Sequence, residues 1–145
     1  MMNVIVDTSV WSLALRRLSV SSNAVVKELH SLVTEGRVAM LGVIRQELLS
    51  GIRADSQFEK LRDHLRVFPD VSIASSDHEE AALFSNRCRA AGIQGSHTDF
   101  LICAVATHHG FAILTMDNDF HHFAKILPVV LHRSSTNTDL IHPSR

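Results

Sequence analysis

The chain lacks an excess of charge, and this shortage excludes one class of protein. Its 145 residues carry 14 Lys and Arg against 15 Asp and Glu, a formal net charge of −1. A passive nucleic-acid binder normally has a strong basic excess, so that class is excluded. An enzyme that acts on nucleic acid is not excluded, because bound metal ions would change the charge of its site.

Cysteines and long apolar runs are also scarce. Cys88 and Cys103 lie in different segments and form no CxxC motif, which suits a reduced cytosolic protein. No apolar stretch reaches the roughly 18 residues of a membrane-spanning helix. Asp7 interrupts any signal-peptide pattern near the N-terminus. We therefore expect a soluble, cytoplasmic protein.

What the chain does have is enough apolar sequence for one globular core. Hydrophobic residues make up 46% of its length, which suits a single domain. We expect that domain to span residues 1–133. The polar segment 134–145 shows no periodicity and is expected to be a tail that is disordered or packs locally.

Short apolar runs alternate with segments of helical periodicity. The runs expected to be strands are residues 4–6, 38–41, 112–115 and 128–131. Helical spacing predicts helices between them, including 11–18 and 24–34, the latter capped from Ser21–Ser22–Asn23. Phe100–Ala106 is apolar on every face, as a buried central helix is. This order predicts a three-layer α/β/α fold with a mostly parallel central sheet.

Acidic residues stand at four element ends of this predicted fold. Asp7 follows the first strand, Glu47 lies at or near a helix start, and Asp99 opens the buried helix. Asp117 and Asp119 follow the third strand. In a parallel sheet these ends share one edge, and carboxylates gathered there repel one another unless cations neutralise them. Oxygen ligands suit Mg²⁺ or Mn²⁺ rather than zinc, and such a site suits attack by water on a phosphodiester.

Each acid also has a purely structural explanation. Asp99 is the fourth residue of the sequence Ser96–Asp99, which fits a helix capping box. Glu47 fits an acid favoured by a helix dipole, and Asp117 with Asp119 fits turn chemistry. Singly, these structural explanations are favoured. The occurrence of all four acids at one predicted edge is what favours a site.

Four motifs occur in order along the chain: VDTSVW at residues 6–11, ELLxGI at 47–52, TDxxIxAxA at 98–106 and LTxDxDF at 114–120. Together they resemble the pattern of PIN-domain nucleases, and more narrowly that of the VapC-type toxins of bacterial toxin–antitoxin pairs. The resemblance covers residues 3–131. It implies an endoribonuclease that uses Mg²⁺ or Mn²⁺, inhibits translation, forms a homodimer, and is held by a VapB-like antitoxin that inserts a basic residue into the acidic cleft.

The resemblance also assigns roles to residues. The acids that match the metal-binding positions are Asp7, Glu47, Asp99, Asp117 and Asp119, and the first four of them match the catalytic set. The hydroxyl residues that match the positions orienting these acids or a water are Thr8, Ser9 and Thr115. In this hypothesis Asp7 is the central ligand, a metal-bound water attacks phosphorus, and no covalent nucleophile is needed. Whether one or two ions bind stays open.

Two other functions compete with this reading. A haloacid-dehalogenase-type phosphohydrolase also begins with a strand and an Asp, but it needs a second Asp where this chain has Ser9. A non-catalytic PIN-like binding module is the other alternative.

The cations expected near an RNA cleft are Arg45, Arg53, Arg87 and Arg89. His97 is expected to be either a further substrate contact or a solvated loop residue.

Overall fold

The fold is described from a computed structural model, in which residues 1–16 and 23–133 are described. Its centre is a parallel sheet of β1 (Val4–Val6), β2 (Val38–Ala39) and β3 (Ala112–Leu114), in the order β2-β1-β3. Ile5 pairs with Ala39 on one side and with Ile113 on the other. The middle strand is fully buried, as expected for a parallel strand covered on both faces.

Two further segments extend the sheet by single bridges. Met40 bridges Asp70, and Leu131 bridges Ile113, both in parallel. The predicted strand 128–131 is therefore wrong as a full strand: its link to β3 consists of the Ile113 N–H bond to Val130 and the His132 N–H bond to Ile113. The ladder ends there because the Phe111 N–H, which precedes β3, bonds the Ala106 carbonyl at the end of α6 instead.

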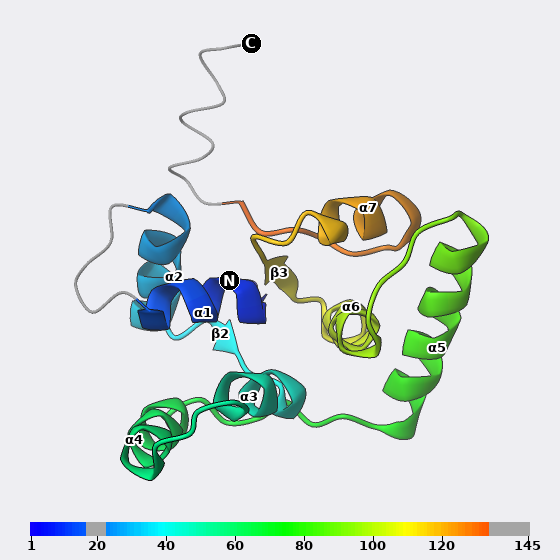
Figure 1. Cartoon of the computed structure of the whole chain (residues 1–145). Coiled ribbons are helices and arrows are strands. Elements are labelled where there is room, and N and C mark those ends of the chain that lie inside the picture. Colours follow the sequence, from blue (N-terminus) through cyan, green and yellow to red (C-terminus); the bar gives the residue numbers. More distant parts are fainter. Residues whose placement is uncertain (17–22, 134–145) are drawn as a thin grey trace.

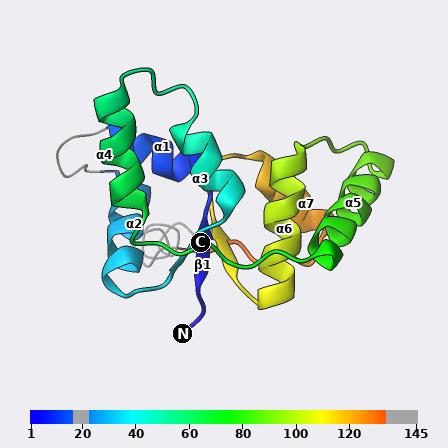
Figure 2. The same ribbon diagram turned by 90° about the horizontal axis from the view of Figure 1, so that it is seen from below.

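Seven helices surround the sheet in the described part of the chain (Figure 1). They are α1 (Thr8–Arg16), α2 (Ala24–Thr34), α3 (Gly42–Leu49), α4 (Asp55–Leu65), α5 (Ser75–Ala90), α6 (His97–His109) and α7 (Asp119–Ile126). Helices α1, α2 and α4 lie on one side of the strands, and α5, α6 and α7 lie on the other (Figure 2). The predicted α/β architecture, a parallel sheet flanked by helices, is confirmed. None of these described helices is long and apolar enough to cross a membrane.

The first helix begins earlier than the sequence predicted. The helix predicted to start at Trp11 begins at Thr8, directly after β1, and its predicted last residues 17–18 lie outside the described residues. Asn23 caps α2, because its Oδ1 accepts hydrogen bonds from the N–H groups of Val25 and Val26. The other candidate caps, Ser21 and Ser22, and the predicted tail 134–145 also lie outside the described residues.

The core is organised around α6. All residues from Phe100 to Ala106 are buried, which confirms the prediction of a central helix. The loop before α6 approaches this core closely at Gly95, where a Cβ atom would lie 2.5 Å from the ring of Phe123 and 3.0 Å from that of Phe100. A residue with a side chain does not fit there without displacing the loop that leads into α6.

Candidate metal centre

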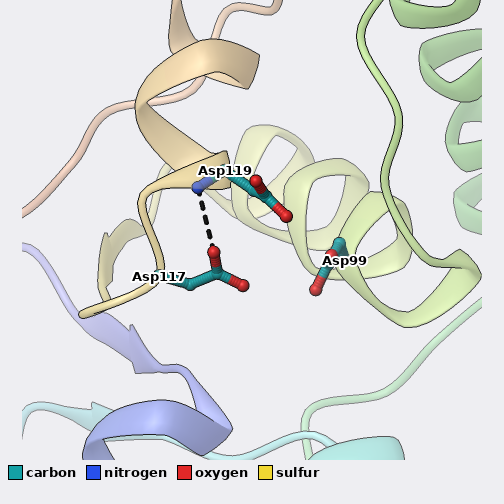
Figure 3. A group of neighbouring side chains, drawn as sticks. All are labelled: Asp99, Asp117 and Asp119. Atoms are coloured by element: carbon teal, nitrogen blue, oxygen red, sulfur yellow. Dashed lines mark hydrogen bonds between the residues drawn. The ribbon is translucent and has the colours of Figure 1, made fainter.

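Three carboxylates converge beside the carboxyl end of β3. Asp99, Asp117 and Asp119 each offer one oxygen, and these oxygens all lie within 4.8 Å of one another. Asp99 stands on the first turn of α6, whereas Asp117 and Asp119 come from the loop after β3 and the start of α7 (Figure 3). The structure thus brings together acids that are separated by the whole of α6 and β3 in the sequence.

Local hydrogen bonds orient the side chains of Asp99 and Asp117. The Ser96 hydroxyl accepts from the Asp99 N–H at 3.0 Å, and the Ser96 N–H donates to the Asp99 carboxylate at 3.3 Å, so the predicted capping box is confirmed. The Asp119 N–H donates to Asp117 Oδ1 at 2.9 Å, which is the turn chemistry also considered from sequence. Asp99 and Asp117 therefore have the structural roles considered from sequence and also converge with Asp119 at one place.

Asp7 lies next to this trio and is held by two hydroxyls. Its side chain is only 6% exposed at the end of β1. Ser9 and Thr115 both donate to its Oδ2, at 2.8 and 2.9 Å. Within the described residues no donor reaches Oδ1, so that oxygen is available for another partner. Asp7 is not one of the three acids whose oxygens all lie within 4.8 Å of one another.

Thr115 connects Asp7 to the trio. Its hydroxyl donates to Asp7 Oδ2 and accepts from the Asp117 N–H, both at 2.9 Å. The Ser9 hydroxyl similarly accepts from the Met116 N–H at 3.0 Å. The loop after β3 is therefore fastened to the loop after β1 through two hydroxyl groups. Because a hydroxyl both donates and accepts, it is suited to this relay.

The electrostatic consequence of this crowding is seen at Asp99. Burial raises the pKa of the Asp99 carboxyl, and the negative charges of Asp7 and Asp117 raise it further, against the opposing hydrogen bonds from Ser96. Each nearby negative charge disfavours the ionised form of its neighbour. A cation placed among these acids would remove that repulsion.

Glu47 lies at the periphery of the same edge. The prediction that it sits at or near a helix start is wrong, because α3 already begins at Gly42. Ile44 and Leu48, one turn apart, both bury against the core, which favours helix over strand from Gly42 onward. Glu47 is exposed, and its Oε1 accepts from the Thr8 hydroxyl at 2.6 Å.

The donor chemistry fits a hard divalent cation. The converging groups are carboxylates and hydroxyls, with no Cys or His among the three clustered residues. Mg²⁺ and Mn²⁺ prefer such oxygen ligands. Thr98, which precedes Asp99, lines a recess together with Thr8 and Glu47, so Glu47 shares the edge on which the cluster stands.

The cations proposed from sequence separate into two kinds. Arg45 is engaged in structure: its guanidinium bonds Asp70 at 2.8 Å and also the carbonyls of Leu65 and Phe68. It therefore fastens the turn after α4, and its guanidinium is already engaged within the fold. Arg89 and His97 instead line a cavity beside Asp99. Asn86, in the same cavity, has no sequence signal, because its position depends on how α5 packs against α6.

Comparison with known proteins yields one family. The model of the PIN domain matches residues 4–126. Ribonuclease VapC11 of Mycobacterium tuberculosis and a VapC ribonuclease of Mycobacterium bovis are each 33% identical over 127 residues, which covers 85% of this chain and 92% of the relative.

Solved structures share the fold at lower identity. The crystal structure of VapBC2 from Rickettsia felis, bound to a DNA fragment from its promoter, superposes with a TM-score of 0.73 at 15% identity, over 92% of this chain and all of that chain. FitAcB from Neisseria gonorrhoeae gives a TM-score of 0.69 at 20% identity, over 89% of this chain and 96% of that chain. These likenesses show that the fold is shared.

Proposed function

Because the chain belongs to the PIN-domain family and, within it, to the VapC ribonucleases, we propose that it is a divalent-metal-dependent endoribonuclease and the toxin of a toxin–antitoxin module. The observation that carries the proposal is the convergence of Asp99, Asp117 and Asp119 within 4.8 Å next to the buried Asp7. The residues proposed to bind metal are Asp7, Glu47, Asp99, Asp117 and Asp119.

The chain's own groups position the reactants. Asp99, Asp117 and Asp119 would hold the cation, together with the Oδ1 atom of Asp7, which no donor reaches within the described residues. The hydroxyls of Ser9 and Thr115 keep the Asp7 carboxylate in one orientation. When bound, Mg²⁺ or Mn²⁺ neutralises these acids, lowers the pKa of a coordinated water and stabilises charge on the leaving oxygen.

Glu47 and Thr8 are proposed to act from the rim of the site. The Thr8 hydroxyl donates to Glu47 at 2.6 Å, which fixes a carboxylate that the fold leaves exposed. In this position Glu47 accepts a proton from, or orients, a water approaching from the recess it lines with Thr98.

The test is cleavage of single-stranded RNA with and without EDTA. Asp7→Asn and Asp99→Asn are expected to lower kcat by roughly 100-fold or more, since removing one group that stabilises transition-state charge has effects of that size. Glu79→Gln, at an exposed acid of α5, is the matched control and should cleave like the wild type. Undiminished cleavage in EDTA would exclude the metal mechanism.

The same assay separates the competing functions. A haloacid-dehalogenase-type enzyme needs an acid where this chain has Ser9, whose hydroxyl instead donates to Asp7. Hydrolysis of a small phosphomonoester without RNA cleavage would favour that class. Absence of both activities, with metal binding retained by calorimetry, would favour a non-catalytic binding module.

We further propose a VapB-like antitoxin and a homodimer as partners. A groove of about 550 Å³ between α1 and the end of α4 is lined mainly by apolar groups, including Trp11, Leu65 and Val67. Val67 is 72% exposed at this groove. An exposed apolar surface suits a protein partner.

The antitoxin's inhibitory action is proposed to be electrostatic. A basic side chain inserted among Asp7, Asp99 and Asp117 would neutralise them in place of the metal. Light scattering at micromolar concentration tests the dimer. Val67→Glu is expected to weaken the antitoxin complex and to leave RNA cleavage by the free protein unchanged.

A further inference from the structure

A second cavity adjoins the acidic cluster. It measures about 390 Å³ and lies between α5, the first turns of α6 and Val43 of α3; we refer to it as the α5–α6 cavity. Thr98 and Val43 line both this cavity and the recess that contains Glu47. The two spaces are therefore neighbours that share one wall, and Asp99 follows Thr98 directly in the chain.

The chemistry of the α5–α6 cavity is opposite to that of the cluster. Its inner surface is apolar and includes Ala81 and Phe100, whereas Asn86, Arg89 and His97 supply polar groups at its rim. Among the residues that line it, all of them in the described part of the chain, none is acidic. An amide and a guanidinium thus stand beside a cavity floor suited to a flat apolar face.

Arg89 is available for a ligand, unlike the other arginines of the fold that are placed near acids. Arg37 and Arg45 are each paired with a carboxylate, at 3.0 and 2.8 Å. Arg89 is exposed, and among the described residues no acid pairs with it. A guanidinium of this kind binds phosphate oxygens through parallel hydrogen bonds.

Each nucleotide of a single-stranded RNA chain presents a phosphate for the guanidinium and a flat base for the apolar floor. The scissile phosphate must sit at the acids, and the next nucleotide then extends away from them with its own phosphate and base. Unstacked RNA bases are recognised by stacking on apolar surfaces and by hydrogen bonds to their edges. A cavity of this volume falls within the range of small-ligand sites.

We propose that the α5–α6 cavity binds the nucleotide adjoining the scissile phosphate of single-stranded RNA, with Arg89 and His97 contacting its phosphate and Asn86 hydrogen-bonding to the base edge. The cavity then sets which base is accepted beside the cut. This inference rests on the proposed ribonuclease function, since it specifies a subsite of the same reaction.

The test compares four forms of the full chain on one randomised single-stranded RNA pool with Mn²⁺: wild type, Arg89→Gln, Asn86→Ala and Lys60→Gln. Lys60→Gln is the charge-matched control, because Lys60 is exposed on α4 and does not line the cavity. The readouts are kcat and KM on one cleaved sequence, the salt dependence of binding, and sequencing of the new RNA ends. Thermal melting verifies that each variant is folded, and light scattering gives its molecular mass.

Arg89→Gln is expected to raise KM roughly tenfold with kcat little changed, as loss of one charge-assisted phosphate contact does. It should also reduce the slope of log affinity against log salt by about 0.7. Asn86→Ala should relax the base preference at a single position beside the cut by roughly fivefold or more. Lys60→Gln should match the wild type in all three readouts.

Three outcomes would overturn the proposal, and they are distinguishable. If the wild type cleaves RNA but Arg89→Gln and Asn86→Ala behave like Lys60→Gln, the subsite is wrong while the ribonuclease function stands. If the two cavity variants change only the molecular mass measured by light scattering, the cavity is a contact between protein copies. If the wild type does not cleave the pool at all, the proposed function fails and the subsite fails with it.

Discussion

Neutralising Asp99 should stabilise the protein when no metal is present. Asp99 shares a 4.8 Å cluster with Asp117 and Asp119, and burial together with the charges of Asp7 and Asp117 raises its pKa. Asp99→Asn removes one negative charge from this group. The amide keeps an oxygen that can still accept the N–H of Ser96, so the cap of α6 is retained.

The size of the effect follows from the distance. Two unit charges separated by 4.8 Å repel by roughly 1 kcal/mol in bulk water and by roughly 3 kcal/mol at an effective dielectric constant of about 20. Asp99 is partly buried and Asp119 is exposed, so the lower figure applies. We expect Asp99→Asn to raise the free energy of unfolding by about 1 kcal/mol at pH 7. For a chain of this size that corresponds to a Tm increase of about 2–4 °C.

The pH dependence has a definite sign. Because the pKa of Asp99 is raised in the folded state, its ionisation destabilises the fold as pH rises through that pKa. Below it, a protonated Asp99 and an Asn are both neutral, so the two proteins should melt at similar temperatures. The advantage of the variant is therefore expected to appear as pH increases from the acidic range toward neutrality.

Divalent metal should reverse the order of stability. A ligand present at 100 times its Kd stabilises the folded state by about 2.7 kcal/mol, and the wild type should gain this from Mn²⁺ while Asp99→Asn gains much less. The assay is thermal melting in EDTA and in Mn²⁺ titrations, with Glu79→Gln as the control for general surface charge. A variant that melts at or below the wild-type temperature in EDTA at pH 7 would refute the reasoning.

Three other substitutions test contacts around the site. Thr115→Val removes the hydroxyl that links Asp7 to the next loop and should lower metal affinity or kcat by roughly 10- to 100-fold, as measured by calorimetry and RNA cleavage. Asp77→Asn should destabilise the fold by about 1–3 kcal/mol in urea unfolding, because the buried carboxylate bonds His108 at 2.8 Å. Burial alone would raise the pKa of Asp77, but hydrogen bonds from Ala74 and His108 outweigh it and lower the pKa, so the difference from wild type should vanish as pH falls through that value. Gly95→Ala should destabilise by about 1–3 kcal/mol, since its methyl group would collide with a buried aromatic ring.

Most of the architecture was predictable because it depends on local periodicity. The helix Ala24–Thr34 and the buried stretch of α6 follow from apolar spacing, and the three strands follow from β-branched or apolar runs. The start of α3 was not predictable, since Val43 and Ile44 suit a strand as well as a helix. Packing of Ile44 and Leu48 against the core decides in favour of the helix.

The residues of the candidate site were predictable from the sequence, but their arrangement in space was not. Acids at element ends give the residues, because parallel strands share one edge. Sequence cannot show that the oxygens of Asp99, Asp117 and Asp119 all lie within 4.8 Å of one another, since that depends on how the loop after β3 turns. The availability of Arg89, and the engagement of Arg45 by Asp70, likewise depend on tertiary contacts.

Sequence and structure describe the role of Asp7 in different terms. From sequence it is the central ligand, whereas in the fold it is the most buried of the five acids and the only one held by two hydroxyls on a single oxygen. A carboxylate fixed in this way loses little conformational entropy when it binds a cation through its other oxygen. Asp7 is therefore suited to fix the position of the ion, while the more exposed Asp119 and Glu47 are suited to adjust as RNA enters. Asp7→Asn should then abolish metal binding more completely than Asp119→Asn, and calorimetric titration with Mn²⁺ in which Asp119→Asn loses as much affinity as Asp7→Asn would contradict this division of roles.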